Sequence, residues 1–431
     1  MKKLSKKQKL IMTIAIILIL IIIAIVYTTN IISNNSQIEN EGYFATTTNA
    51  SSNLIASYIK KGVKVGGITG TLEVLDTSDA DATAEDIAWG KTGYVNGIKI
   101  TGTRIDTVAQ AKESQQAFSE NKILIDDYGN NVKVPAGFKI SEDSATSVTG
   151  GVVIEDVSAP GKTSDTKGSQ FVWIPVGDVL TDTNGSTSTI KLGRYTFDDD
   201  GTKHLVQSAE EYANETQLKT SSNASEYFQE LYTTSSENAK AKDIKAFVTK
   251  TLVSHGYYLG RFEAGDATAT EVPREDSADK PIVCKARVYP YNYGTQLQAS
   301  NLSQRMYSSS NFESDLINSY AWDTAIVFIQ TFSGDTNYSM QKGANTNENL
   351  QKCGESILKF VDSGDEAQDV RCNIYDMAGN CYEWTTEKCS NENYPYVARG
   401  GFYFYEHTVS HRGYTSDGTD ENFTFRPILY L

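Results

Sequence analysis

The segment from Phe402 to Tyr414 holds the side chains of this chain that are best suited to chemistry. Two histidines lie four positions apart, and an acid precedes the first: Glu406, His407 and His411. On a helix this spacing would place both rings on one face, where they could bind a metal ion. Residues 402–405 are all aromatic and favour a strand, in which neighbouring side chains point to opposite faces. A metal site is therefore one of two readings of this segment.

The second reading is a recognition surface. Tyr, His and Arg give a large, rigid contact area with a polar tip at low cost in conformational entropy, as in binding loops. We expect six residues to form a ligand-binding surface: Tyr403, Tyr405, His407, His411, Arg412 and Tyr414. Plain core packing is the alternative, because aromatic residues that alternate along a strand are often buried.

Three short motifs surround this segment. They are Asp376-Met-Ala-Gly-Asn-Cys-Tyr-Glu-Trp384, Arg399-Gly400-Gly401 and Phe425-Arg426-Pro427. In this order they resemble the C-terminal motifs of the formylglycine-generating enzyme (sulfatase-modifying factor) family, although Asn373 and Thr424 stand where the family has glycine. The resemblance implies an α+β, C-type-lectin-like head with irregular loops and short strands. We expect Arg399 and Arg426 to pair with acidic neighbours and Trp384 to fill the core.

The resemblance also implies a structural calcium ion. The family's loop binds the cation through side-chain and backbone oxygens, at positions that match Asp376, Gly379, Cys381 and Glu383 here. Oxygen ligands suit a hard cation such as Ca²⁺, and Cys381 would contribute only its carbonyl. The alternative is that the two carboxylates only stabilise the turn.

The family's catalytic chemistry is not expected. Its enzymes bind copper through two cysteines between the last two motifs, whereas residues 402–424 contain no cysteine. Soft Cu(I) needs thiolate ligands, so we expect no copper and no catalytic residues of the family type. The five cysteines are Cys284, Cys353, Cys372, Cys381 and Cys389, and their spacing does not fix any disulfide pairing.

The N-terminus predicts a membrane anchor. Five lysines in residues 1–9 precede an apolar run from Leu10 to Val26. At ~1.5 Å per helical residue, this run just reaches across a ~30 Å hydrocarbon core. No Ala-x-Ala cleavage pattern follows, which favours an uncleaved signal anchor over a cleaved signal peptide. Since positive charge stays cytoplasmic, we expect a single-pass cell-membrane protein, held by the lipid bilayer, with a cytoplasmic N-terminus and an extracellular head.

Two related units follow the expected anchor. Ile-Thr-Gly-Thr occurs at 68–71 and again at 100–103, which is 32 positions later. In the second unit Asn96-Gly97 is flanked by alternating apolar residues, which predicts a two-residue β-hairpin turn. The units resemble short repeats of Firmicute phage tail and fibre proteins, and we interpret them as a stalk.

The sequence as a whole predicts the following domain organisation. Residues 1–27 form the basic tail and anchor, 28–48 a flexible linker, 49–105 the two β-hairpin repeats, 106–130 a linker or helix, and 131–431 the head. Within the head we expect strands at 132–138, 152–155, 171–177 and 256–264, and helices at 239–253 and 315–331.

The net charge of the chain bears on the class of partner that it can bind. The net charge of −15 disfavours nucleic acid as a partner, because phosphates need neutralising Lys and Arg. The favoured function is binding or adhesion to an unknown protein or glycan by a non-catalytic head of this family type. The alternatives are a metal-dependent oxidoreductase with other catalytic residues and a structural surface or prophage virion component. An enzyme would need convergent ionisable groups, and a binder would need accessible aromatic groups.

Overall fold

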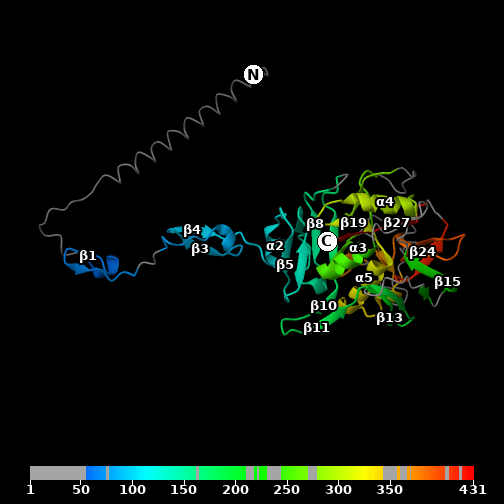
Figure 1. Ribbon diagram of the computed structural model, residues 1–431, viewed down its shortest axis with the longest axis horizontal. Helices are drawn as coiled ribbons and strands as arrows, with labels where there is room; N and C mark the ends of the chain where they lie inside the picture. The colour runs from blue at the N-terminus through cyan, green and yellow to red at the C-terminus, as the bar shows by residue number, and fades with distance from the viewer. Residues whose placement is uncertain are drawn as a thin grey trace, which may run out of the picture. The chain divides into compact units, whose positions relative to one another are not determined.

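The computed structural model describes most of the chain. The described residues are 55–73, 77–161, 165–209, 218–220, 223–230, 244–269, 279–342, 357–359, 366–368, 370–402, 407–416 and 420–431 (Figure 1). The chain divides into two compact units, Met1–Ala80 and Asp81–Leu431.

The fold class expected from the sequence is wrong. Among the described residues, 36% are in strands and 19% in helices, so the protein is mostly β and not α+β of the C-type-lectin-like kind. Antiparallel pairing dominates the head, and Val, Tyr, Thr and Ile fill these strands because branched and aromatic side chains fit a pleated surface.

The membrane prediction is corrected as well. In the part of the chain that the structure describes, no helix is both long and apolar enough to cross a bilayer. The segment expected to be the anchor, residues 1–27, lies outside the described residues, as does the linker at 28–48. The transmembrane helix, the bilayer as a partner, the single-pass topology and the extracellular placement of the head therefore have no support from the structure.

The first repeat belongs to the first unit. A 3₁₀ turn at Ala56–Tyr58 precedes the short strands β1 (Lys64–Val65) and β2 (Ile68–Thr69), which pair antiparallel. A Cβ on Gly70 would lie 2.3 Å from the Ile59 and Lys60 carbonyl oxygens, so this position requires glycine.

The second repeat, in the second unit, has the same construction. Here a 3₁₀ turn at Ala84–Asp86 precedes β3 (Thr92–Val95) and β4 (Ile98–Thr101). Asn96 and Gly97 join these strands with positive φ angles of 50° and 76°, which confirms the predicted hairpin turn. A Cβ on Gly102 would lie 2.3 Å from the Ile87 and Ala88 carbonyl oxygens, as at Gly70, which explains why the Ile-Thr-Gly-Thr ends recur.

Two six-stranded sheets organise the head. The first has the order β19 (Glu313–Leu316), β28 (Pro427–Tyr430), β16 (Gly256–Gly260), β9 (Gln170–Pro175), β8 (Val153–Asp156) and β7 (Phe138–Ile140). The second has the order β14 (Leu218–Thr220), β15 (Asn223–Glu230), β24 (Tyr382–Cys389), β25 (Tyr396–Arg399) and β26 (Arg412–Thr415), with β27 (Phe423–Phe425) parallel to β24.

Smaller strand pairs surround the sheets. They are β5 (Lys122–Ile125) with β6 (Asn131–Val134), β10 (Gly177–Leu180) with β11 (Thr187–Ile190), β12 (Gly193–Phe197) with β13 (Lys203–Ser208), β17 (Gly265–Asp266) with β18 (Ile282–Val283), β20 (Ile357–Lys359) with β21 (Glu366–Gln368), and β22 (Val370–Arg371) with β23 (Ile374–Tyr375). The described α-helices are α2 (Val108–Ser114), α3 (Ile244–Ser254), α4 (Gln296–Met306) and α5 (Ser319–Phe332). Single 3₁₀ turns occur at Val148–Gly150 and Tyr338–Met340.

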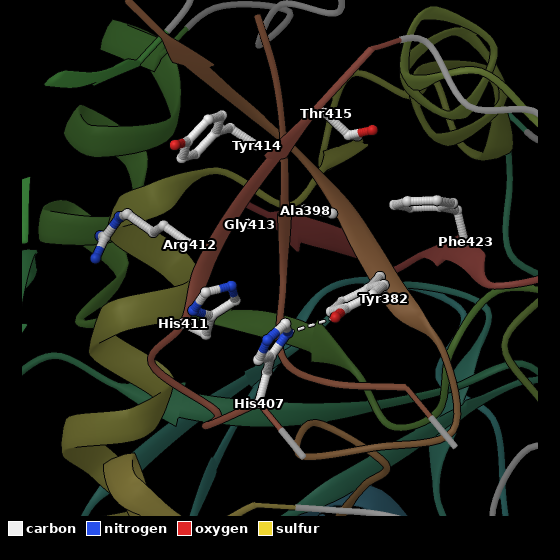
Figure 2. A pocket seen from close by; sticks show the side chains of 9 residues that line it. All are labelled: Tyr382, Ala398, His407, His411, Arg412, Gly413, Tyr414, Thr415 and Phe423. Atoms are coloured by element: carbon white, nitrogen blue, oxygen red, sulfur yellow. Dashed lines mark hydrogen bonds between the residues drawn. The ribbon is translucent and has the colours of Figure 1, made fainter. Parts of the chain in front are cut away.

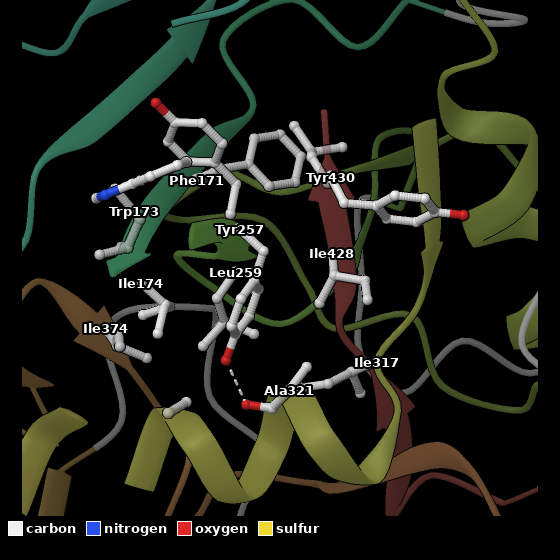
Figure 3. Close-up of a cluster of buried hydrophobic side chains, with 14 of the residues drawn as sticks. Phe171, Trp173, Ile174, Tyr257, Leu259, Ile317, Ala321, Ile374, Ile428 and Tyr430 are labelled. Carbon is white, nitrogen blue, oxygen red and sulfur yellow. Dashed lines mark hydrogen bonds between the residues drawn. The ribbon is translucent and has the colours of Figure 1, made fainter. Parts of the chain in front are cut away.

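Helix α5 is the centre of the core. Twelve of its 14 residues are buried, including the polar Asp323 and Gln330, so the helix is surrounded by protein on nearly all sides. Asn318 caps it by accepting a 2.9 Å hydrogen bond from the Ala321 backbone N–H. The Tyr257 hydroxyl donates to the Ala321 carbonyl at 2.5 Å, which joins β16 to the helix (Figure 3). Helix α5 also contacts β12 and β24, so it supports the second sheet through β24.

Candidate functional site

A cavity of about 390 Å³ opens on the second sheet. Strands β24, β25 and β26 supply most of its wall, and the turn before β26 and the first residue of β27 supply the rest. The lining residues are Tyr382, Ala398, His407, His411, Arg412, Gly413, Tyr414, Thr415 and Phe423 (Figure 2). We call this the aromatic cavity.

Two buried side chains hold the turn at 407–411 in place. Arg399 donates through Nε to the His411 carbonyl at 2.9 Å, and Trp322 of α5 donates through Nε1 to the Val409 carbonyl at 3.1 Å. Gly401 permits this approach, because a Cβ there would be 2.9 Å from the His407 carbonyl. The Arg399-Gly400-Gly401 motif therefore positions the histidines.

Aromatic rings form a continuous wall. The ring centroids of Tyr382 and Phe423 are 5.6 Å apart, and those of Tyr382 and His407 are 5.7 Å apart. His407 stacks on His411 with centroids 4.1 Å apart, and its Nδ1 shares a hydrogen bond with the Tyr382 hydroxyl. A ligand with a flat apolar face would find stacking partners here.

Both histidines of the wall are neutral at pH 7. Burial, the neighbouring His407 and the charges of Arg399 and Arg412 lower the pKa of His411 to about 3. Burial and Lys342 also lower the pKa of His407. The wall therefore presents uncharged imidazoles with hydrogen-bonding nitrogens.

Arg412 adds no open charge to the cavity. Its side chain extends away from Tyr382 and Phe423 in Figure 2 and is 2% exposed. Its Nη2 lies 2.5 Å from Asp323 Oδ2, and its Nε lies 2.9 Å from Glu387 Oε1. The charge of Arg412 is thus compensated behind the wall.

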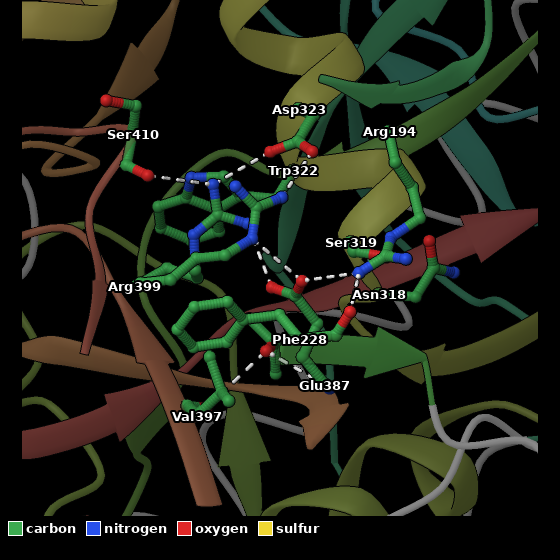
Figure 4. Close-up of polar contacts among 12 residues, drawn as sticks. Arg194, Phe228, Asn318, Ser319, Trp322, Asp323, Glu387, Val397, Arg399 and Ser410 are labelled. Carbon is green, nitrogen blue, oxygen red and sulfur yellow. Dashed lines mark hydrogen bonds and ion pairs between the residues drawn. The ribbon is translucent and has the colours of Figure 1, made fainter. Parts of the chain in front are cut away.

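The same two acids bind two more arginines. Asp323 pairs with Arg399 at 2.7 Å, and Glu387 pairs with Arg399 at 3.0 Å and with Arg194 at 3.2 Å (Figure 4). Burial alone would raise the pKa of Glu387, but the charges of Arg412, Arg399 and Arg194 lower it to about 2. We call Arg194, Asp323, Glu387, Arg399 and Arg412 the buried ion network. Its Arg399 pairing confirms the prediction of an acidic neighbour.

The sequence located part of the aromatic cavity. Of the six residues expected to bind a ligand, His407, His411, Arg412 and Tyr414 line it. Tyr403 and Tyr405 lie outside the described residues, as does Glu406. Sequence reasoning missed Tyr382 and Phe423. Period-two alternation from the buried Trp384 could have found Tyr382, because both rings lie on the same face and contact Phe423.

A metal centre at the histidines gains no support. His411 donates its backbone N–H to the Thr408 carbonyl in a turn, and β26 begins at Arg412, so His407 and His411 do not lie on a helix. Within the described part of the chain, no three His, Cys, Asp or Glu side chains are grouped so that they could hold a metal ion.

In the loop that was expected to bind calcium, the Glu383 carboxylate is paired with an arginine. Both oxygens of Glu383 accept hydrogen bonds from Arg426, the shortest at 2.5 Å, which confirms the predicted pairing of this arginine. Nearby Glu263 accepts from the Asn380 side chain at 2.5 Å and from the Cys381 N–H at 3.1 Å. Since Glu383 already has a cationic partner, the donor set fits calcium only in part. Calcium at Asp376, Gly379, Cys381 and Glu383 stays a prediction.

The core prediction for this loop is confirmed. Trp384 and Ile374 are fully buried, and Met377 is 1% exposed. The described cysteines, Cys284, Cys372, Cys381 and Cys389, are not joined by disulfides, and Cys353 lies outside the described residues. Burial raises the pKa of the Cys284 and Cys372 thiols to about 12, so neither is a reactive thiolate at pH 7.

Comparison with known proteins adds little. No protein-family model matches the sequence, and no curated protein matches it. A solved structure, Treponema denticola variable protein 1, aligns with 64% of this chain and 100% of its own, at 11% identity and a TM-score of 0.27. A TM-score this low carries no conclusion about fold or function.

Proposed function

We propose that this protein is a non-catalytic binding protein that holds its ligand in the aromatic cavity. The observation that carries the proposal is the cavity wall, where Tyr382, Phe423 and His407 form an uncharged aromatic surface. A volume of about 390 Å³ is within the usual range for small-ligand sites.

The wall selects the chemistry of the ligand. The charge of Arg412 is compensated by Asp323 and Glu387, so the cavity offers no strong attraction to an anion. Stacked rings with polar edges favour a neutral group with a flat apolar face, such as a sugar ring or an aromatic side chain. The ligand class that we propose is therefore a neutral glycan or an aromatic residue of a protein, which is narrower than the unknown protein or glycan expected from the sequence.

The motif resemblance agrees with a binding role. Residues 402–424 lack the cysteine pair through which the formylglycine-generating enzyme family binds copper. This difference favours binding over that family's copper chemistry.

The test uses the full chain and its His407→Ala variant. Binding is measured on an array of neutral oligosaccharides and aromatic short peptides. We expect at least a tenfold loss of affinity for His407→Ala, because the stacked wall and the hydrogen bond to Tyr382 are both lost. His204→Ala is the matched control, since this histidine is exposed on β13 and outside the cavity.

Other outcomes decide against the proposal. Equal losses in His407→Ala and His204→Ala would contradict it, and Tyr382→Phe serves as a milder second variant if His407→Ala unfolds. Copper or iron bound by the purified chain would favour the oxidoreductase. Failure of every probe to bind would favour a structural component.

A further inference from the structure

The floor of the aromatic cavity consists of two small residues. Ala398 of β25 and Gly413 of β26 are paired across the second sheet, and both line the cavity (Figure 2). Trp384 of β24 is paired with Ala398 from the other side, so the three residues form one row across the sheet. Because Ala398 ends in a methyl group and Gly413 has no side chain, a ligand can lie close to the sheet at this point.

The fold does not require glycine at position 413. A Cβ on Gly413 would lie 3.4 Å from His411 Nε2 and 3.5 Å from the Ala398 carbonyl oxygen, which are ordinary contact distances. The φ angle of Gly413 is also outside the left-handed region. Gly401 differs, since its Cβ would lie 2.9 Å from the His407 carbonyl oxygen. Glycine inside a strand often marks a place where a ligand approaches the backbone closely, and the cavity lies over Gly413.

The rings of the cavity wall and its support form one column. Trp384 and Phe423 are nearly parallel, with an interplanar angle of 10° and centroids 4.4 Å apart. The next angles along the column are 30° to Tyr382, 35° to His407 and 27° to His411. Each of the three inner rings therefore has two near-parallel neighbours. Its faces are turned toward other rings, and its edge is left for a ligand.

Ring edges favour an aromatic ligand over a sugar. An aromatic ring carries partial negative charge on its faces and partial positive charge on its edge, so the edge of one ring attracts the face of another. The apolar face of a sugar consists of C–H groups, which are weakly positive and stack best on aromatic faces. In this column the inner rings cover the faces of one another.

The strand beside the floor lies at the edge of its sheet. Among the described residues, β26 pairs with β25 and with no other strand. Gly413 and Thr415 of β26 both line the cavity. An extended peptide can form backbone hydrogen bonds with such an edge while one of its side chains enters the adjacent cavity. A sugar cannot continue the hydrogen-bond pattern of a sheet.

We propose that the ligand of the aromatic cavity is a peptide segment with an aromatic side chain, and that Gly413 determines this specificity. The inference rests on the proposed function and chooses between the two ligand classes given there. The ring of the ligand lies on the floor formed by Ala398 and Gly413, with one face toward the edges of Tyr382 and Phe423.

Calorimetric titration of the full chain tests the proposal with three probes: a blocked Gly-Phe-Gly tripeptide, the same tripeptide with cyclohexylalanine in place of phenylalanine, and cellotriose. The cyclohexyl ring is similar in size and more apolar, but it has no negative face. We expect the phenylalanine probe to bind with a Kd near or below about 1 mM. It should bind about threefold to tenfold more tightly than the cyclohexylalanine probe and at least about tenfold more tightly than cellotriose.

Gly413→Ala and Gly294→Ala are the matched variants. Gly294 also has a φ angle outside the left-handed region, and its Cβ would lie 3.5 Å from the nearest Tyr291 atom, but it does not line the cavity. We expect Gly413→Ala to weaken binding of the phenylalanine probe by about tenfold or more, because an extra methyl group in a close-fitting pocket has an effect of this size. Gly294→Ala should bind like the wild type.

The melting temperature of Gly413→Ala separates a role in binding from a role in folding. It should equal or exceed that of the wild type, because alanine loses less conformational entropy than glycine on folding. A fall in melting temperature would show that the fold itself requires glycine there and would overturn the role of Gly413. The comparison of phenylalanine with cyclohexylalanine uses the wild type alone and does not depend on this variant.

Three binding results would also overturn the proposal: cyclohexylalanine binding as tightly as phenylalanine, cellotriose binding most tightly, or equal affinity of Gly413→Ala and wild type for the phenylalanine probe. Cellotriose binding that is lost in His407→Ala would leave the proposed function intact and make the ligand a glycan. Absence of binding by all three probes at about 10 mM would contradict the proposed function as well.

Discussion

Two cavities of the head each have an arginine in their lining but use it differently. In the aromatic cavity Arg412 points into the buried ion network, where Asp323 and Glu387 compensate it. Another cavity, of about 570 Å³ at the first sheet, is lined by Asp143, Glu155, Gln170 and Arg261, and there the partly exposed Asp143 compensates Arg261. The comparison shows that a count of charged lining residues does not give the field that a ligand meets. The electric field in each cavity depends on the acidic side chains that pair with its arginine.

The largest effect should come from the acid behind the aromatic cavity. Glu387→Gln removes a fully buried anion that bonds Arg194, Arg399 and Arg412. We expect a loss of about 3–5 kcal/mol in the free energy of unfolding, because buried guanidinium groups lose their partner. Urea denaturation of the full chain measures it.

Asp143→Asn is the matched change at the cavity around Arg261. The Asp143 side chain is 60% exposed, so water can replace its pairing with Arg261. We expect a loss below about 1 kcal/mol. Equal losses for Glu387→Gln and Asp143→Asn would break the comparison, since the two arginines would then depend on their acids to the same extent.

A pH titration sharpens the claim that the aromatic cavity is uncharged. The unfolded chain protonates His411 near the ordinary pKa of 6.5, whereas the folded chain does so only near a pKa of about 3. Acid therefore favours the unfolded state, and stability falls as the pH drops below 6.5. Between pH 6.5 and 4.5 we expect the wild type to lose about 2 kcal/mol relative to His411→Gln.

The control for this titration is His204→Gln, which removes an exposed histidine. Its pH profile should run close to that of the wild type. If His411→Gln shows the same pH slope as the wild type, His411 is not held neutral and the aromatic cavity carries charge in mild acid.

The smallest effect concerns calcium. Glu383 is already paired with Arg426, so an added cation gains less there than at an unpaired carboxylate. We expect saturating calcium to raise the melting temperature by less than about 2 °C relative to chelator, with magnesium as the control. A larger rise that is absent from Asp376→Asn would show that the loop binds calcium strongly.

The structural features that the sequence predicted correctly depend on residues close together in the chain. The hairpin at Asn96-Gly97 needs only two residues with positive φ, and the core position of Trp384 follows from its size and apolar character. The helix expected at 315–331 begins at Ser319 instead, because Glu313–Leu316 pairs with β28 as a strand. Local helical spacing could not reveal a partner more than a hundred positions away.

The candidate sites depend more strongly than the hairpin or the core on contacts between residues that are far apart in the sequence. Arg412 was expected to face a ligand, but its partner Asp323 lies 89 positions earlier and turns its charge inward. The cavity around Arg261 joins Asp143, Arg261 and Tyr375 from separate parts of the chain, so no motif marks it. Pairing of the sheets brings these groups together, and neither periodicity nor composition encodes that pairing.

The position of β28 has a consequence for how this protein is made. This strand lies between β19 and β16, and Ile428 is paired with both Leu259 and Asp315. During synthesis, the edges of β16 and β19 that pair with β28 lack their backbone hydrogen bonds until residue 430 has left the ribosome. Such long-range closure slows folding and leaves exposed edges that invite association, so the growing chain should depend on chaperones during synthesis.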